Sequence, residues 1–185
     1  MDEDIEIKPR TSIEVAQRIL ALLAVVERVY QKPPDHIRDW VKTNKVAEHF
    51  SSDESDFFFS DNVTEKQLIH FSWRAETLAS LLWSIYGIDK MPSLDEIVDL
   101  SSVALIKEMY LNPSKFLTET KLRPEEEIDE FEESLCEQHW AVRDAQINHK
   151  TIPPGINPEI IQERRYGSCW LVGFGEDWDD VPTDT

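Results

Sequence analysis

TLASLLWSIY, residues 77–86, predicts a helix without a charged side chain on any of its faces. The preceding "TEKQ" (64–67) has the form of a capping box, and Gly87 is a typical residue at the end of a helix. A helix that is apolar all round has to be covered on every side, so it belongs inside a domain. The stretch 64–86 therefore predicts the central helix of the fold.

Helical spacing of apolar residues recurs along the chain, without an internal repeat or a convincing alternation of period two. Residues 51–62 read as a polar loop or short helical turn that holds three phenylalanines. "SCWLVGF" (168–174) is compatible with a strand, but no second strand pattern is present to pair with it. The prediction is an all-α, single-domain helical bundle of about seven helices over residues 1–185. Besides 64–86, the expected helices are 11–31, one capped by Asp35, 93–111 opened by "SLDE", 112–120 as a short helix or turn, 124–149 and 158–174.

The charge balance restricts the partners that the protein can have. The chain carries 37 acidic and 19 basic residues, which gives a formal net charge of −18. Because nucleic-acid affinity comes from Lys and Arg, this balance argues against nucleic acid and permits a basic protein, a metal or simply a soluble acidic surface.

The sequence also indicates where in the cell to expect the protein. The acidic first residues do not resemble a signal peptide, and we expect residues 1–9 to be flexible. The longest apolar run, 19–26, is too short to span a membrane. Two cysteines make no disulfide framework. We therefore expect a cytoplasmic protein that does not associate with membranes.

Three of the predicted helices place charged side chains on inner faces close to a tryptophan. In helix 124–149 we expect the first half to be exposed and the second half to be buried on two sides. Because an isolated buried charge costs several kcal/mol, we expect these charges to pair in one network, with guanidinium groups stacked on indoles. The residues concerned are Arg74 and Glu76 in the first helix, Trp140, Arg143 and Asp144 in the second, and Glu163, Arg164 and Trp170 in the third.

The acidic C-terminal tail, residues 175–185, contains an apolar anchor. Acidic, proline-containing chain ends are usually solvated, but Trp178 favours docking on the helices. We expect the docked tail to bring Asp179 or Asp180 to one of the two arginines of "ERRY" (163–166).

The segments "FSWRAETLASLLW", "HWAVRDA", "ERRYGSCWLVGF" and "WDDVPTDT" resemble the family called domain of unknown function 4272, whose members are mostly bacterial. The resemblance extends over residues 10–185, although the loop "SSDESDFFFSDN" departs from the family. Because the family name assigns no activity, the resemblance singles out residue positions but implies no chemistry for them. The positions that it singles out are Arg74, Glu76, Trp140, Arg143, Asp144, Glu163, Arg164, Trp178, Asp179, Asp180, Asp184 and Thr185.

Motifs of known catalytic chemistry are missing from the sequence. "CEQH" (136–139) places a thiol and an imidazole one helical turn apart, but zinc needs three or four such ligands and no matching pair follows. A Cys–His nucleophile has no activating feature, and phosphate-binding, EF-hand and hydrolase-elbow patterns are absent. We expect no metal and no cofactor, and the sequence favours a protein that is not an enzyme.

Two functions from different classes are compatible with these features. The first is a cytoplasmic interaction module that binds a basic protein partner, as immunity proteins bind toxins. The alternative is an enzyme or binder of a small polar or anionic ligand, which uses the Arg74, Arg143 and Glu163 cluster as its pocket. A structural role for the cluster, in fixing helix register, competes with the second function. Nucleic-acid mimicry by surface carboxylates is a third hypothesis.

Overall fold

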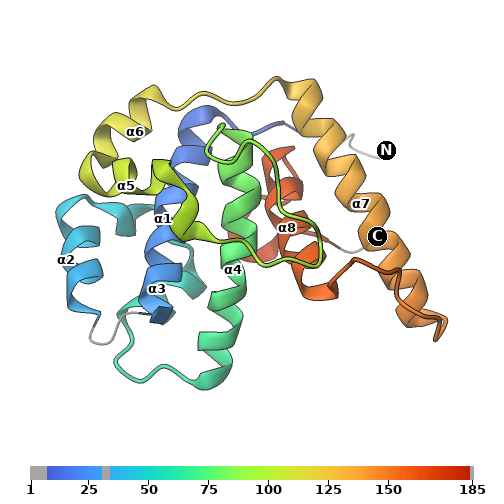
Figure 1. Cartoon of the computed structure of the whole chain (residues 1–185). Helices are drawn as coiled ribbons and strands as arrows, with labels where there is room; N and C mark the ends of the chain where they lie inside the picture. Colours follow the sequence, from blue (N-terminus) through green and yellow to red (C-terminus); the bar gives the residue numbers. More distant parts are fainter. Residues whose placement is uncertain (1–7, 31–33, 184–185) are drawn as a thin grey trace, which may run out of the picture.

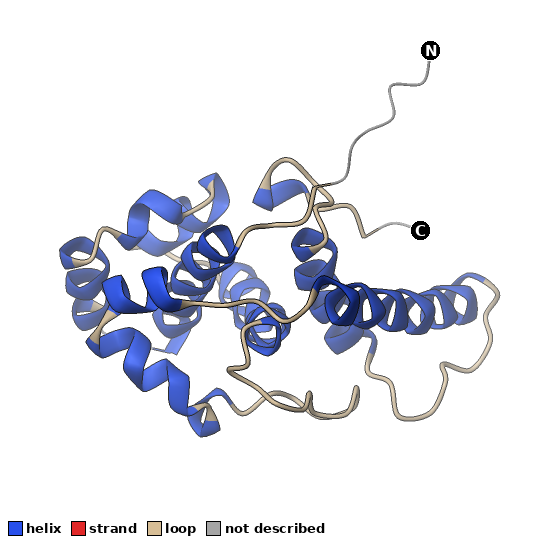
Figure 2. Ribbon diagram, turned by 90° about the horizontal axis from the view of Figure 1, so that it is seen from above, coloured by secondary structure: helices blue, strands red, loops and turns tan. Residues whose placement is uncertain are grey.

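The computed structural model describes residues 8–30 and 34–183, and every regular element within those residues is a helix (Figure 2). The all-α prediction is confirmed, with eight α-helices among the described residues in place of about seven. The strand alternative for residues 168–174 is wrong, because this segment begins with the last turn of a helix. The prediction that residues 1–9 are flexible concerns residues that lie mainly outside the described part of the chain. The elements are α1 (Ser12–Tyr30), α2 (Asp35–Thr43), η1 (Val46–His49), α3 (Ser52–Phe59), α4 (Glu65–Ser84), η2 (Leu100–Ser102), α5 (Ala104–Leu111), α6 (Pro113–Glu119), α7 (Glu125–Ile147), α8 (Pro158–Leu171) and η3 (Trp178–Asp180).

Helix α4 is central, as predicted, and lies between α1 and α8 (Figure 1). Its capping box is formed: the Thr64 hydroxyl oxygen accepts from the Gln67 amide at 3.2 Å, and the Gln67 side chain accepts from the Thr64 amide at 2.9 Å. All side chains in residues 77–82 of α4 and 19–26 of α1 are buried. Among the described residues, neither α1 nor any other helix is long and apolar enough to cross a membrane.

Helices α4 and α8 approach closely because small residues face each other across their contact. A Cβ atom added at Gly167 would lie 2.9 Å from the Thr77 carbonyl oxygen and 3.1 Å from the Ser80 Cβ. Around this point the Ser80 hydroxyl donates to the Arg164 carbonyl oxygen at 2.9 Å, and the Thr77 hydroxyl lies 3.1 Å from the Glu163 carbonyl oxygen. The close approach is what brings the charged side chains of the two helices together.

Residues 93–103 do not form the first part of a helix, which corrects the prediction for 93–111. The helix α5 begins only at Ala104, and the preceding segment is a loop with one 3₁₀ turn. Carbonyl oxygens at the start of this loop accept hydrogen bonds from the Arg164 guanidinium, and the Val98 amide donates to Glu76. These backbone groups are therefore bonded to side chains of α4 and α8, and "SLDE" forms no capping box.

The aromatic segment 51–62 is more ordered than a loop. It forms α3, whose capping box pairs Ser51 with Glu54, and both Phe57 and Phe58 are fully buried. Phe57 stacks on Phe71 of α4 with ring centroids 4.1 Å apart. The many polar residues of this segment suggested a loop. The two buried phenylalanine rings instead anchor it as an amphipathic helix.

The start of α2 also differs from the prediction. Pro34 is the N-cap residue and makes no side-chain cap, and Asp35 is the first residue inside the helix. At this position the carboxylate still interacts favourably with the helix dipole, because it lies in the first turn.

Helix α7 lies at the edge of the molecule and packs on α8 (Figure 1). Its buried side chains form one stripe, Ile128, Leu135, His139, Val142 and Ala145. Burial of the second half on two sides is wrong: Trp140 is 49% exposed and Ile147 is 66% exposed. Helix α7 also reaches α4 through Phe131, whose ring stacks on the Trp83 ring with centroids 4.1 Å apart. Neither this contact nor the one with α8 covers Trp140 or Ile147.

The close contact at Gly167 predicts an unusual effect of a helix-stabilising substitution. Glycine to alanine inside a helix normally stabilises by about 0.5–1 kcal/mol. We expect Gly167→Ala to lower the free energy of unfolding by about 1–3 kcal/mol instead, because the new methyl group overpacks the contact with α4. Chemical denaturation measures the change, and Gln162→Ala, at an exposed position of α8, is the matched control. A stabilised Gly167→Ala protein would contradict the close approach.

Candidate functional site

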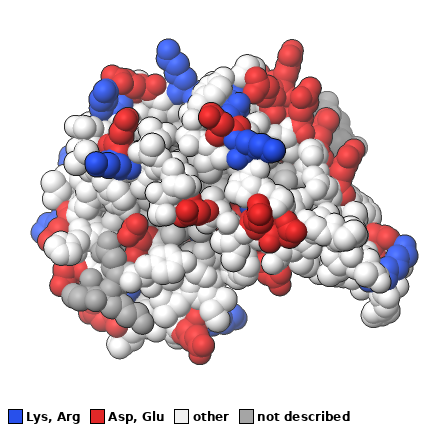
Figure 3. Space-filling model, viewed as in Figure 1, with Lys and Arg blue, Asp and Glu red and all other residues white. Residues whose placement is uncertain are grey.

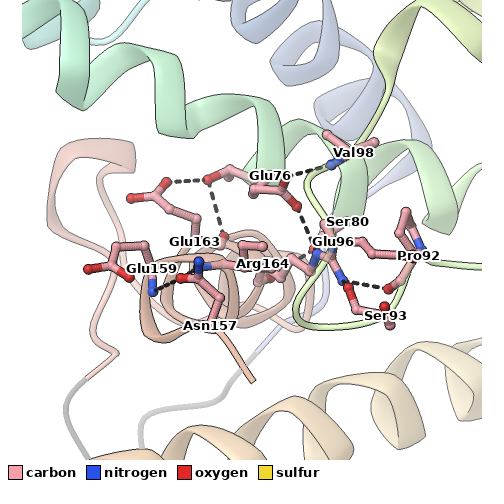
Figure 4. A network of polar contacts seen from close by, with 12 residues as sticks. Glu76, Ser80, Pro92, Ser93, Glu96, Val98, Asn157, Glu159, Glu163 and Arg164 are labelled. Carbon is pink, nitrogen blue, oxygen red and sulfur yellow. Dashed lines mark hydrogen bonds and ion pairs between the residues drawn. The ribbon is translucent and has the colours of Figure 1, made fainter. Parts of the chain in front are cut away.

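The best-buried charges of the candidate site are Glu76 of α4 and Arg164 of α8, each 1% exposed (Figure 4). Arg164 Nε donates to Glu76 Oε2 at 2.9 Å, and the Val98 amide donates to Glu76 Oε1 at 2.7 Å. The terminal guanidinium nitrogens of Arg164 donate to the carbonyl oxygens of Pro92 at 2.7 Å, Ser93 at 3.2 Å and Glu96 at 2.8 Å.

This arrangement leaves no position for a ligand at the pair. Both oxygens of Glu76 and all three guanidinium nitrogens of Arg164 already have partners within the protein. A buried ion pair is stable only when such additional hydrogen bonds satisfy both groups. The pair therefore has the geometry of a structural contact that joins α4, α8 and the loop 92–98.

A second ion pair lies beside the first and is also mostly buried. Arg74 Nη1 donates to Glu163 Oε2 at 3.2 Å, and the Thr77 hydroxyl donates to the same oxygen at 2.7 Å. The Arg74 guanidinium carbon lies 4.0 Å from the centroid of the Tyr166 ring. The expected pairing between α4 and α8 is thus confirmed, with a tyrosine as the main ring under Arg74.

The α7 part of the predicted network is wrong. Trp140 and Arg143 are exposed, and the polar contact that Arg143 makes among the described residues is with the nearby Gln146 side chain, at 3.5 Å. Asp144 accepts from Lys150 at 2.8 Å, and this hydrogen bond lowers the pKa of the Asp144 carboxyl. These residues lie about a quarter turn or more away from the stripe that packs on α8, so no second helix covers them.

The C-terminal tail is docked, as predicted, through Trp178. Its indole is buried and meets the Trp170 ring edge-on at 5.3 Å, and the Tyr166 hydroxyl donates to its carbonyl oxygen. The Arg18 guanidinium lies 4.5 Å above the indole. Trp178 thus connects the tail to both α1 and α8.

The acidic residues of the tail do not make the predicted contacts with "ERRY". Asp179 accepts from the Asp53 amide at 3.1 Å, at the start of α3, and Asp180 is exposed. The tail reaches Arg165 instead through the Thr183 carbonyl oxygen, at 2.8 Å. Asp184 and Thr185 lie outside the described residues.

A third buried pair, Arg18 with Glu54, was not predicted from the sequence. Arg18 Nη2 donates to Glu54 Oε2, which also accepts from the Ser51 amide at 3.0 Å. Burial lowers the pKa of Arg18, and the charge of Glu54 opposes that change. Two signals could have identified it: "SSDE" (51–54) has the capping-box form, and Arg18 lies within the apolar pattern of α1.

A fourth group of polar side chains lies where α7 meets α8. Arg165 Nη1 lies 2.9 Å from His139 Nδ1. A guanidinium only donates, so His139 Nδ1 is the acceptor in this contact. Cys169 donates to Glu132 at 3.6 Å, and burial raises the pKa of the Cys169 thiol to about 12, which rules out a thiolate nucleophile there near neutral pH.

The described residues contain no group of three or more His, Cys, Asp or Glu side chains that could hold a metal ion. Cys136 and His139 therefore gain no further ligands from the parts of the chain that the structure places. The buried ion pairs thus join helices to one another, and Trp140 and Ile147 of α7 are among the exposed large apolar side chains of the molecule.

The difference between the two arginines of the predicted network gives a direct test. We expect Arg164→Ala to lower the free energy of unfolding by about 3–5 kcal/mol, because it leaves the Glu76 carboxylate buried without its partner. Arg143→Ala should change it by less than about 1 kcal/mol, because Arg143 is exposed. Denaturant titration of both variants measures the two values, and similar losses in both would contradict this assignment of burial.

A family comparison agrees with the resemblance seen in the sequence motifs. The model of the family described as "Domain of unknown function (DUF4272)" matches residues 1–181. No curated protein and no solved structure matches the chain. The match covers nearly the whole sequence, and the chain therefore belongs to the DUF4272 family of domains of unknown function.

Proposed function

We propose that the protein is an interaction module that binds a basic protein partner through the outer face of α7. We define the outer face as the residues that lie on the side of α7 opposite its contact with α8 at helical spacing. They are Glu126, Glu130, Glu133, Glu137, Trp140, Asp144 and Ile147.

The charge of α7 supports a basic partner. The helix carries nine carboxylates and a single Lys or Arg residue, Arg143, and seven of the carboxylates are exposed. Figure 3 shows acidic side chains gathered at the upper right of the molecule, over the first half of α7. Such a surface attracts a basic protein over a long range and raises the rate of association.

The exposed apolar residues on the same face can contribute binding energy by being buried against a partner, which charge alone does not provide. Trp140 lies three residues after Glu137 of the outer face, Ile147 lies seven residues after Trp140, and Arg143 flanks them. Tryptophan and arginine are the residue types that most often dominate binding energy at protein interfaces. An exposed tryptophan beside an acidic stripe on one helix face is the observation that carries the proposal.

The alternative function, binding of an anionic ligand at the arginines, has less support. Arg164 and Glu76 are each 1% exposed, and Arg143 is not part of the buried cluster. The buried arginines are bonded to carboxylates and backbone carbonyl oxygens, which leaves them poorly placed to hold an added anion.

The proposal predicts that one face of α7 controls capture of a basic protein. The chain is immobilised and exposed to cell lysate, and the amount of basic protein that it captures is measured. We expect Trp140→Ala to reduce this amount at least about tenfold, and the charge reversal Glu133→Lys with Glu137→Lys to do the same. Binding should also weaken between about 50 and 300 mM salt, because charge attraction is screened. Quantitative mass spectrometry of the captured proteins measures both effects.

Two matched controls distinguish binding by this surface from non-specific adsorption. Leu111→Ala removes another exposed apolar side chain, and Glu65→Lys reverses a carboxylate at the start of α4. Both should leave the captured basic protein unchanged. Capture that is insensitive to salt, or equal losses in the controls and the α7 variants, would overturn the proposal.

A further inference from the structure

A cavity of about 470 Å³ lies between the end of α1, the middle of α4 and the loop that precedes α5. Its apolar walls include Tyr30, Trp73, Ile97 and Leu100. Tyr30 is 69% exposed and Ile97 is 67% exposed, although both are large apolar side chains. The volume is in the range of sites that hold small molecules.

The loop wall of this cavity is fixed by the buried ion pair. The Val98 amide is bonded to Glu76, and the Glu96 carbonyl oxygen is bonded to Arg164. Ile97, between them, is held with its side chain toward solvent and contributes to the cavity lining. The cavity is thus a product of the same contact that prevents this segment from becoming helical.

The charge of Glu27 favours a cationic ligand. Of the two acidic lining residues, Glu76 is already paired with Arg164, so Glu27 supplies the negative charge, and none of the described lining residues is a lysine or an arginine. Two aromatic residues, Tyr30 and Trp73, are also in the lining, and aromatic rings attract cations. An anion would meet the Glu27 carboxylate and no lysine or arginine among the described lining residues, whereas the net charge of −18 concentrates small cations near the surface.

We propose that this cavity binds a small organic cation with an apolar body, of the alkylammonium class. The ammonium group lies among Glu27, Tyr30 and Trp73, where a carboxylate and two rings stabilise a positive charge. The alkyl chain packs against Ile97 and Leu100 and is removed from water. The elements that form this site exclude α7, so binding here is independent of the proposed protein interface.

Three probes of equal chain length test the proposal on the intact protein: hexylammonium, the neutral hexan-1-ol and the anionic hexanoate. Isothermal titration calorimetry gives the affinities, and nuclear magnetic resonance follows the Trp73 indole and the amides of residues 97–101. We expect hexylammonium to bind with a Kd of about 1 mM or tighter. Hexan-1-ol should bind about tenfold more weakly, and hexanoate should not bind measurably.

Variants identify the residues responsible. Glu27→Gln, which keeps the shape of the side chain, and Tyr30→Ala should each weaken hexylammonium binding about tenfold. The matched controls are Glu65→Gln and Ile69→Ala, which change an exposed carboxylate and an exposed apolar residue of α4 outside the cavity, and they should bind like the unchanged protein. The proposal is overturned by equal affinity for hexylammonium and hexan-1-ol, by equal losses in variants and controls, or by no spectral change at about 10 mM probe.

Discussion

The fold depends on the contact between α4 and α8, at whose centre Glu76 and Arg164 form a fully hydrogen-bonded ion pair. Removing two charges from water costs several kcal/mol per ion, and only their mutual attraction and the added hydrogen bonds offset that cost. The pair uses backbone groups of the loop 92–98 for this purpose. The hydrogen bonds that satisfy the two charges therefore also position the loop, and the loop forms one wall of the cavity beside α1.

The molecule separates its charges by role. Arginine–carboxylate pairs inside the fold join elements distant in sequence, as Arg18 joins α1 to Glu54 of α3 and Arg74 joins α4 to Glu163 of α8. The unbalanced carboxylates that produce the net charge lie outside, and many of them are on α7. Helix α7 uses only one stripe of side chains to pack against the core. Its opposite face, with Trp140, is free of the constraints that fix the interior, which suits a surface that recognises another protein.

Helical periodicity was sufficient to place the charges of α4 and α8 but not those of α7. For α4, the uncharged run 77–86 indicated burial on all faces, so Arg74 and Glu76 had to lie among buried neighbours. For α7, two apolar stripes were visible, and the sequence contains no information on how many helices are available to cover them. The loop 93–103 could not be recognised for a similar reason. Carbonyl oxygens at its start accept hydrogen bonds from Arg164 in place of helical partners, and Arg164 lies about 70 positions further along the chain.

Hydrogen exchange at the Val98 amide is the most direct measurement of the central contact. This amide lies in a loop, where exchange is normally fast, yet it donates to the buried Glu76 carboxylate at 2.7 Å. In the unchanged protein it should exchange as slowly as the core amides of α4, and Glu76→Ala should remove that protection more than it affects the amides of α1. Rapid exchange of Val98 in the unchanged protein would contradict the conclusion that the ion pair holds the loop.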